Sequence, residues 1–232
     1  MQENQKIIVA IDGTAGSGKS SICKEAISQR PWSYLNTGIL YRATAYLLQY
    51  NNIDPRNQIQ LKDFEENILT KLSWNSKKGV LLYNDKDIMA KLLEEKIGQL
   101  TSKISQISEV RKLLLPLQKD LTLKQKERVI LVDGRDISTV VFPDAHLKVF
   151  ITSDARTRAK RRLKQLNMKP SKESLLEMEQ KILQRDKQDK ERENAPLLKH
   201  SQAFEIDTST QSLSESVGIF VAKVEEAIDK FN

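Results

Sequence analysis

Eight residues near the N-terminus have the types and spacing of a phosphate-binding loop. Gly13-Thr14-Ala15-Gly16-Ser17-Gly18-Lys19-Ser20 fits the pattern G-x-x-x-x-G-K-[ST] at every fixed position. The glycines permit backbone angles that turn successive N–H groups toward one point, where they form an anion nest with the start of the following helix. Lys19 would reach the β- and γ-phosphates of a nucleotide, and the Ser20 hydroxyl would supply a hard oxygen to Mg²⁺.

A basic cluster between Asp154 and Lys169 is the second group with chemical potential. It holds seven Lys and Arg residues against one acid, which nearly accounts for the net charge of +7 of the whole chain. Arg158, Arg161 and Arg162 are spaced i, i+3 and i+4, so a helix would carry them on one face. Guanidinium groups on one face suit a transferring phosphoryl group, whose charge spreads over several oxygens. A solvated helix face is the alternative interpretation.

Three more charged residues share the spacing of one helix stripe. Arg185, Asp189 and Arg192 stand at i, i+4 and i+7 in a segment that we predict to be helical from residue 172 to about 193. Two cations flanking a carboxylate form either a surface ion-pair ladder or part of a binding site. The spacing by itself favours the ladder.

The segments that must position these residues have an α/β pattern. Lys6–Asp12 is a β-branched run that is apolar on both faces and ends at a glycine, as expected of a buried parallel strand. Further strands are predicted at Val129–Asp133, Leu147–Thr152 and Ala203–Asp207, and helices at residues 18–29, 99–107, 108–126, 154–166, 172–193 and 213–231. The alternation predicts one domain, residues 1–232, with a P-loop NTPase-type parallel sheet core flanked by helices.

One stretch interrupts this alternation. Three short strand-like pieces, Lys71–Trp74, Val80–Tyr83 and Asp87–Met89, are separated by turn-forming sequences at residues 75–79 and 84–85. They predict a small antiparallel meander inserted into the α/β fold. In the helix predicted after it, Pro116 predicts a kink or a late start, because proline cannot complete the helical hydrogen bonds.

Composition excludes several classes of protein. Of the 232 residues 39% are hydrophobic and 30% charged, and no run approaches the roughly 20 apolar residues of a membrane helix. One cysteine and two histidines exclude a disulfide framework, a Cys-based zinc site and a multi-histidine metal site. The N-terminus lacks the basic and apolar regions of a signal peptide. We expect a soluble cytoplasmic protein.

The chain resembles the bacterial cytidylate kinase family of P-loop nucleoside monophosphate kinases. The matching segments follow the family's order and spacing over roughly the whole chain: Ile11–Ser21, Tyr34–Arg42, Val132–Ala145 and Arg185–Leu197. The third of them, VDGRDISTVVFPDA, is the most specific. The meander is similar to the insert of the bacterial branch, which the shorter eukaryotic-type UMP/CMP kinases lack. The chain departs from the usual pattern at Asn36, where Asp is common, and at Ser138, where Gly is common.

This resemblance implies Mg²⁺-dependent transfer of a phosphoryl group from ATP to CMP and dCMP in pyrimidine nucleotide metabolism. It implies a monophosphate-binding region with its insert at about residues 37–110 and a mobile helical lid at about 154–172. ATP would be bound by the P-loop residues Gly13, Thr14, Ala15, Gly16, Ser17, Gly18, Lys19, Ser20 and Ser21. The implied catalytic residues are Lys19 and the lid arginines Arg158, Arg161 and Arg162.

The resemblance also implies how CMP would be held. Its phosphate would contact Thr37, Arg42 and Arg135. Its cytosine would be read by Ser102, Arg111 and Asp136, and its ribose and phosphate would contact Arg185, Asp189 and Arg192. A carboxylate accepts a hydrogen bond from the amine of cytosine, whereas uracil would present a carbonyl to it.

One of these assignments constrains the local structure. Ser102 and Arg111 are nine residues apart, which on one straight helix would place them on opposite sides. They can meet the same base only if the chain turns between them, and Ser108 is the predicted N-cap of a new helix there.

Two other functions remain open from the sequence. The first is another small-molecule P-loop kinase that acts on UMP, AMP or a non-nucleotide. The second is an ATP-dependent nucleic-acid-binding protein, which would bind DNA or RNA with a steep salt dependence. The localised basic cluster, without interleaved aromatic residues, argues against the second. We therefore expect ATP and CMP or dCMP as partners, no nucleic acid, no membrane and a monomer.

Overall fold

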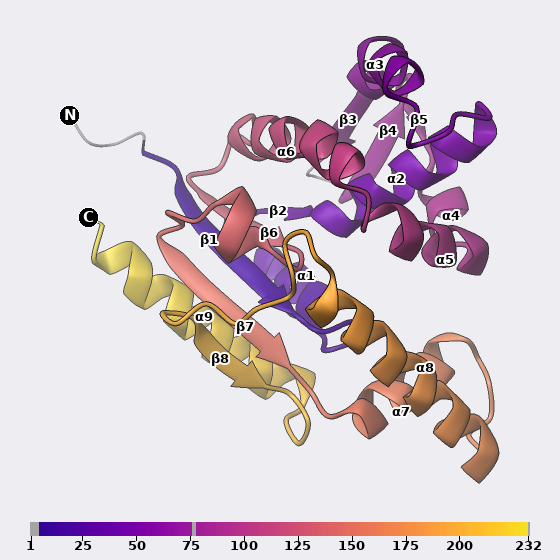
Figure 1. Cartoon of the computed structure of the whole chain (residues 1–232). Helices are drawn as coiled ribbons and strands as arrows, with labels where there is room; N and C mark the ends of the chain where they lie inside the picture. The colour runs from indigo at the N-terminus through magenta and orange to yellow at the C-terminus, as the bar shows by residue number, and fades with distance from the viewer. Residues whose placement is uncertain (1–4, 76–77, 232) are drawn as a thin grey trace. The chain divides into compact units, whose positions relative to one another are not determined.

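The computed structural model describes residues 5–75 and 78–231, which form two compact units. The first unit contains the chain up to Trp32 and from Glu127 onward, and the second runs from Ser33 to Lys126. The larger sheet has the strand order β2-β6-β1-β7-β8, and a three-stranded sheet has the order β3-β4-β5. The predicted α/β class with an antiparallel insert is confirmed (Figure 1). In the described part of the chain, no helix is both long and apolar enough to span a membrane.

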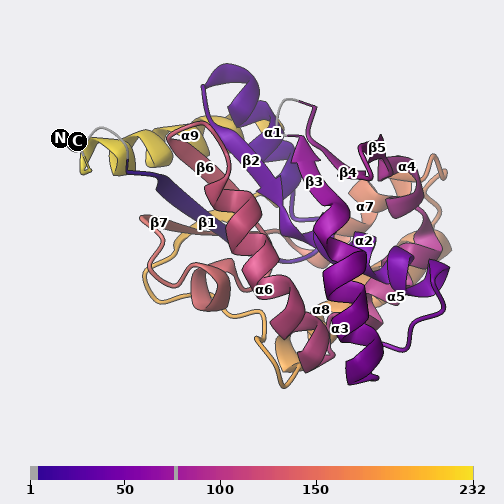
Figure 2. The same ribbon diagram turned by 90° about the horizontal axis from the view of Figure 1, so that it is seen from above.

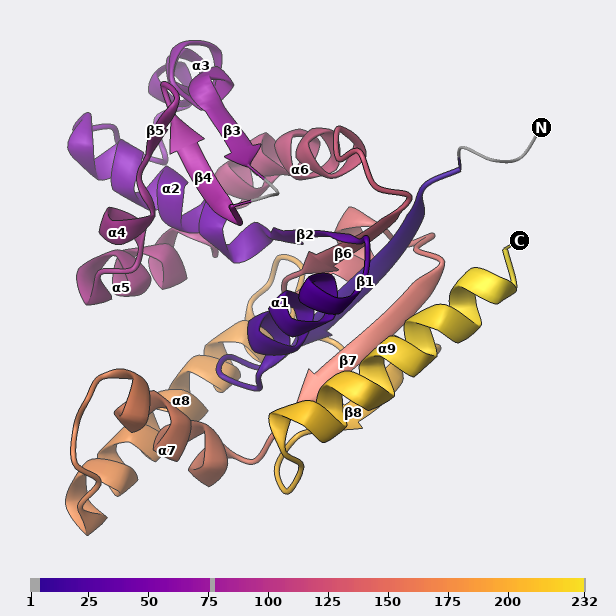
Figure 3. The same ribbon diagram turned by 180° about the vertical axis from the view of Figure 1, so that it is seen from behind.

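The first unit is built on parallel strands. Its elements are β1 (Ile7–Gly13), α1 (Lys19–Gln29), β6 (Val129–Asp133), the π-helical turn η2 (Ile137–Val141), β7 (Leu147–Thr152), α7 (Ala155–Gln165), α8 (Lys172–Glu191), β8 (Phe204–Asp207) and α9 (Leu213–Asp229). Every residue of β1 and β6 is buried, which explains why both read as continuous apolar runs. Helices α1 and α9 cover one face of the sheet (Figure 3), and η2 lies on the other (Figure 1).

Strand register brings the functional segments to one edge of this sheet. β1 pairs in parallel with β6, with Ile11 opposite Asp133, and with β7, with Gly13 opposite Ile151. At Gly13 φ is 148°, and a Cβ built there would lie 1.9 Å from the carbonyl oxygen of Ile151. Only glycine therefore fits where β1 turns into the P-loop.

The second unit consists of helices around its own apolar core, with the small sheet. Its elements are β2 (Ser33–Asn36), α2 (Thr37–Tyr50), α3 (Gln58–Asn67), η1 (Leu69–Lys71), β3 (Leu72–Asn75), β4 (Val80–Tyr83), β5 (Lys86–Asp87), α4 (Met89–Leu92), α5 (Glu95–Ile104) and α6 (Ser108–Leu123). The core includes Phe64, Leu81, Leu92 and Leu114, all fully buried. Figure 2 shows α6 running beside α3 and α2.

The predicted meander is confirmed, since β3, β4 and β5 pair antiparallel in sequence order. The turn predicted at residues 75–79 includes residues 76 and 77, which lie outside the described part. At the other turn, Asn84 and Asp85 have φ of 49° and 59°, which two-residue hairpin turns of the I′ type require.

Three local predictions are corrected. Helix α6 begins at Ser108 and continues through Pro116, so the late start is wrong; the N-cap is Ile107 and not Ser108. Helix α8 ends at Glu191, so Arg192 is extended and does not continue the helical stripe. The C-cap Arg192 has φ of −62° and ψ of 137°, and Ala195, which precedes Pro196, has φ of 51°.

Candidate active site

The P-loop connects β1 to α1 and has the form of an anion-binding turn. Gly16 and Gly18 have φ of 76° and 95°, so glycine is favoured at both positions. Gly18 is the N-cap of α1, where no side chain caps the helix and no acidic residue occupies the first turn. No carboxylate of that turn would therefore compete with a phosphate for the helix amides.

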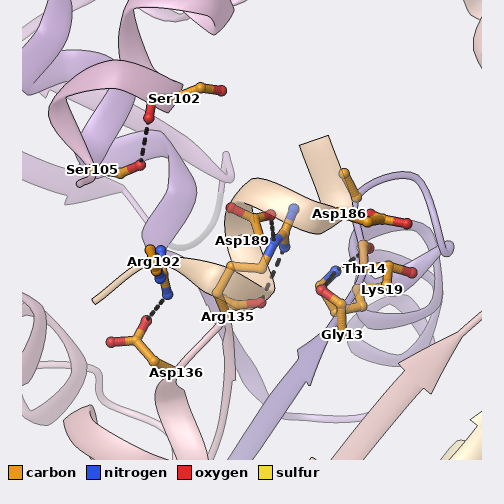
Figure 4. A network of polar contacts seen from close by, with 12 residues as sticks. Gly13, Thr14, Lys19, Ser102, Ser105, Arg135, Asp136, Asp186, Asp189 and Arg192 are labelled. Atoms are coloured by element: carbon orange, nitrogen blue, oxygen red, sulfur yellow. Dashed lines mark hydrogen bonds and ion pairs between the residues drawn. The ribbon is translucent and has the colours of Figure 1, made fainter. Parts of the chain in front are cut away.

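Lys19 is buried and its ammonium group folds back onto the loop. Its Nζ donates to the carbonyl oxygens of Gly13 at 2.9 Å and Thr14 at 2.8 Å (Figure 4). Burial, followed by repulsion from the guanidinium of Arg135, lowers the pKa of Lys19 to about 7. Asp133, Asp12 and Asp189 act in the opposite direction on this pKa, and an anionic ligand in the loop would further favour the protonated lysine.

Two further side chains of the loop fit an incoming phosphate. The hydroxyl oxygens of Thr14 and Ser17 are buried and have no hydrogen-bond partner among the described residues. Buried polar atoms are normally paired, so these two have hydrogen-bonding capacity left for a ligand.

The residues present also fit Mg²⁺ bound together with nucleotide phosphates. The Ser20 hydroxyl donates to Oδ2 of Asp133 at 2.8 Å, which places two oxygen atoms of the kind that Mg²⁺ prefers side by side at the end of β6. Within residues 5–75 and 78–231, no group of three or more His, Cys, Asp or Glu side chains could hold a metal. One hydroxyl and one carboxylate with substrate phosphates and water is the usual environment of Mg²⁺ in phosphoryl-transfer enzymes. Sequence reasoning named Ser20 but missed Asp133, although its place at the carboxyl end of a predicted strand was a usable signal.

Arg158 lies on α7 and is held against the P-loop in a buried ion pair. Its Nη1 and Nη2 donate to the two carboxylate oxygens of Asp186 on α8, at 2.9 and 2.5 Å. Nη1 also donates to the carbonyl of Ala15 at 3.2 Å, and Nε to that of Ser153 at 2.9 Å. The side chains of Arg158 and Asp186 are 4% and 10% exposed. Sequence reasoning missed Asp186, because nothing local links residues 28 positions apart.

Arg161 is tied to the same loop through Thr208, which follows β8. Arg161 donates from Nη1 to the Thr208 hydroxyl at 2.9 Å and from Nη2 to its carbonyl at 2.7 Å. The Thr208 hydroxyl in turn donates to the carbonyl of Ser17 at 2.9 Å. Arg162 lies in the last turn of α7 and Ser21 in the first turn of α1. Thr208 was also missed, although it follows a predicted strand at the edge of the sheet where ligands bind.

Arg135 and Asp136 follow β6 and each is paired with a residue near the end of α8. Nε of Arg135 donates to Asp189 at 2.9 Å, and Nη2 of Arg192 lies 3.6 Å from Oδ1 of Asp136 (Figure 4). Burial alone would raise the pKa of Asp189, but the charge and hydrogen bond of Arg135 hold it below its usual value, with a further contribution from Arg185. These partly and fully buried pairs across two segments do not form a surface ladder.

The second unit brings together three of its four predicted residues. Arg42 donates to the carbonyl of Leu92 at 2.6 Å and approaches Gly98 so closely that a Cβ there would lie 3.1 Å from its Nη2. The Ser102 hydroxyl donates to the carbonyl of Gly98 at 3.3 Å. Arg42 and Ser102 thus meet around one glycine of α5.

Arg111 joins this group from α6. Its Nη1 donates to the carbonyl of Ser105. The Ser105 hydroxyl in turn donates to the carbonyl of Ser102 at 3.2 Å (Figure 4). The guanidinium also lies 5.5 Å from the ring centre of Tyr41 on α2. The turn required between Ser102 and Arg111 is confirmed by the end of α5 at Ile104. Thr37, the fourth residue, is buried at the start of α2, one helical turn before Tyr41.

Comparison with known proteins identifies one family. The family model described as Cytidylate kinase matches residues 9–226. A cytidylate kinase of Thermodesulfovibrio yellowstonii is 40% identical, over 95% of this chain and 99% of that protein. A cytidylate kinase of Clostridium tetani is 36% identical, over 97% and 96% of the two chains. A bifunctional pantoate ligase/cytidylate kinase of Prochlorococcus marinus is 39% identical over 95% of this chain, which spans 42% of that longer protein.

Proposed function

Because the chain belongs to the cytidylate kinase family, we propose that it transfers the γ-phosphoryl group of ATP to CMP and dCMP, forming CDP and dCDP. The observation that carries this proposal lies at the edge of the parallel sheet. The P-loop leaves β1 beside the end of β6, and the Arg135–Asp136 segment leaves β6 there. One pair of adjacent strands thus positions both a triphosphate-binding loop and a cation next to a carboxylate. We place the reaction in cytoplasmic pyrimidine nucleotide metabolism.

The proposed reaction needs alignment and charge neutralisation more than proton transfer. A nucleoside monophosphate is already an anion at neutral pH, so its attacking oxygen requires no general base. The P-loop amides and Lys19 bind the β- and γ-phosphates of ATP. Arg158 and Arg161, which lie against the loop, offset negative charge on the transferring group. Ser20 and Asp133 would hold Mg²⁺ bound with ATP, which would neutralise further charge on the phosphate oxygens.

The acceptor is assigned to the remaining residues. Arg135, with Thr37 and Arg42, holds the CMP phosphate, and Arg185, Asp189 and Arg192 contact its ribose and phosphate. Ser102, Arg111 and Asp136 recognise the cytosine. Asp136 is the selective group, because its carboxylate accepts from the cytosine amine and would face an acceptor in uracil. The helical segment at about 154–172 acts as a lid that excludes water, so that ATP is not hydrolysed instead.

A coupled assay of ADP release tests this function. The protein is supplied with Mg-ATP and, in separate reactions, CMP, dCMP, UMP, AMP or no acceptor. We expect CMP and dCMP to turn over at least a hundredfold faster than UMP, and Lys19→Ala to lower turnover by orders of magnitude with an unchanged circular dichroism spectrum. Faster turnover of UMP or AMP would refute the base assignment, and ATP hydrolysis without acceptor transfer would refute the kinase assignment.

A further inference from the structure

The segment that carries Arg135 and Asp136 is hydrogen-bonded to β1 both before and after these two residues. Before them, the Gly134 amide donates to the carbonyl of Ile11 at 2.9 Å. After them, two successive amides and one hydroxyl donate to the carboxylate of a single β1 residue, Asp12. The amides are those of Ile137 and Ser138, each at 2.8 Å, and the hydroxyl is that of Ser138 at 2.5 Å.

Asp12 is placed to act through this segment and not on a substrate. It is 1% exposed, and both of its carboxylate oxygens accept hydrogen bonds from the protein. Burial raises the pKa of Asp12, while its hydrogen bonds with Ser138 and Ile137 act in the opposite direction. An anion at the first amides of a helical turn also satisfies donors that have no partner within the turn.

The hydrogen bonds of Asp12 fix the backbone conformation that follows Asp136. Asp136 is the N-cap of η2, with φ of −140° and ψ of 27°, and its carbonyl accepts from the amides of Val140 and Val141. Fixing the next peptide to Asp12 holds ψ of Asp136, and thereby the direction in which its side chain leaves the backbone toward Arg192. Asp12 is also the residue before Gly13, so the same strand end supports the P-loop.

We propose that Asp12, together with the Ser138 hydroxyl, is a positioning residue for CMP: it orients the carboxylate of Asp136 toward the base and the guanidinium of Arg135 toward the phosphate. This inference rests on the proposed function, because it assigns those two side chains to CMP. It predicts that weakening the Asp12 contacts impairs recognition of CMP more than binding of ATP. Ser138 is the cleaner probe, because its substitution removes one contact of Asp12 and leaves the residue that precedes the P-loop unchanged.

The experiment compares Ser138→Ala and Asp12→Asn with Ser216→Ala. Ser216 is a matched control: it is a buried serine of α9, in the same unit, whose hydroxyl donates to Gln211 and Ser212 just before that helix. For Ser138→Ala we expect KM for CMP to rise about three- to tenfold and the preference for CMP over UMP to fall by a similar factor, with KM for ATP within twofold. Asp12→Asn should raise KM for CMP more than tenfold, and the control should change neither KM.

Hydrogen exchange of residues 134–141 gives a readout that needs no substrate. Exchange of the Ile137 and Ser138 amides should accelerate at least tenfold in Asp12→Asn and less in Ser138→Ala, and should stay unchanged in Ser216→Ala. The inference is overturned if KM for CMP stays within twofold in Ser138→Ala, or if KM for ATP rises by the same factor.

The two possible failures are distinguishable. If the unmodified protein does not phosphorylate CMP, the proposed function fails, and the exchange data alone decide whether Asp12 holds the segment. If the unmodified protein is active but the variants keep their KM for CMP, only the positioning role fails. If Asp12→Asn does not fold, the KM values and amide exchange of Ser138→Ala alone test the positioning role.

Discussion

Removing one partner of the buried ion pair between Arg158 and Asp186 should strongly destabilise the first unit. The variant Asp186→Asn keeps the shape of the side chain and removes its charge. Arg158 would then stay enclosed, with a side chain only 4% exposed, and would keep its hydrogen bonds to the carbonyls of Ser153 and Ala15 but lose the negative charge of Asp186. A buried cation without its counter-ion is costly, because little water is available to solvate it.

The magnitude follows from the geometry of the pair. Nη1 and Nη2 of Arg158 bond to the two carboxylate oxygens of Asp186 in a bidentate arrangement, and the Asp186 side chain is 10% exposed. Removing one partner of such a buried pair typically costs about 3–5 kcal/mol of unfolding free energy. For a chain of this length, 1 kcal/mol corresponds to about 2–4 °C in Tm, so we expect Tm to fall by about 10 °C.

Urea denaturation followed by circular dichroism measures this change, with two comparisons. Glu191→Gln is the matched control: Glu191 lies on the same helix and pairs with Lys187 at 3.9 Å, but both side chains are more than 60% exposed. It should cost less than about 1 kcal/mol. The double variant Arg158→Met with Asp186→Leu should recover part of the loss, because it leaves no unpaired charge. A loss in Asp186→Asn no larger than that in Glu191→Gln would refute the reasoning.

Three further predictions concern the site. The pKa of Asp189 is held below its ordinary value of 3.8, so its charged form adds stability that is complete above about pH 4 and is lost as pH falls through the lower native pKa. Urea denaturation at pH 5 and pH 3 should therefore show a smaller loss of unfolding free energy on acidification in Asp189→Asn than in the unmodified protein. Asp133→Asn should raise the Mg²⁺ concentration for half-maximal activity about tenfold or more, whereas an unchanged Mg²⁺ titration would contradict the pairing with Ser20 as a metal site. Thr208→Val should lower kcat about tenfold by releasing Arg161, and Thr208→Ser should restore it; equal losses in both variants would point to packing instead.

The parallel core and the P-loop could be predicted because their signals are local. Val129–Asp133 and Leu147–Thr152 were predicted with the bounds that the structure has. Strands buried on both faces need continuous apolar residues, and the loop needs glycines at fixed positions. The meander could also be predicted, since turn-forming residues such as Asn84-Asp85 separate its strands.

The pairing of charged residues could not be predicted, because it depends on contacts between distant segments. The helical spacing suggested that Asp189 pairs with the cations of its own helix, but its carboxylate accepts from Arg135, 54 residues away. Arg192 leaves the helix altogether and meets Asp136. Helix periodicity describes only one element, whereas the choice between a surface ladder and a site depends on what packs against that element.

Asp12 and Asp133 look equivalent in the sequence, because each lies at the carboxyl end of a parallel strand. A shift of one residue in their register gives them different contacts. Both are carboxylates at the ends of adjacent parallel strands, and Asp133 is opposite Ile11, not Asp12. Side chains alternate between the faces of a sheet, so the two carboxylates point to opposite faces. Helix α1 covers one face, where Asp133 accepts from Ser20, and η2 lies on the other, where Asp12 accepts from Ile137 and Ser138 (Figures 1 and 3). One edge of the sheet can therefore place the proposed metal-binding oxygen of Asp133 under the P-loop and the anchoring carboxylate of Asp12 under the proposed base-recognising segment, and neither carboxylate could replace the other.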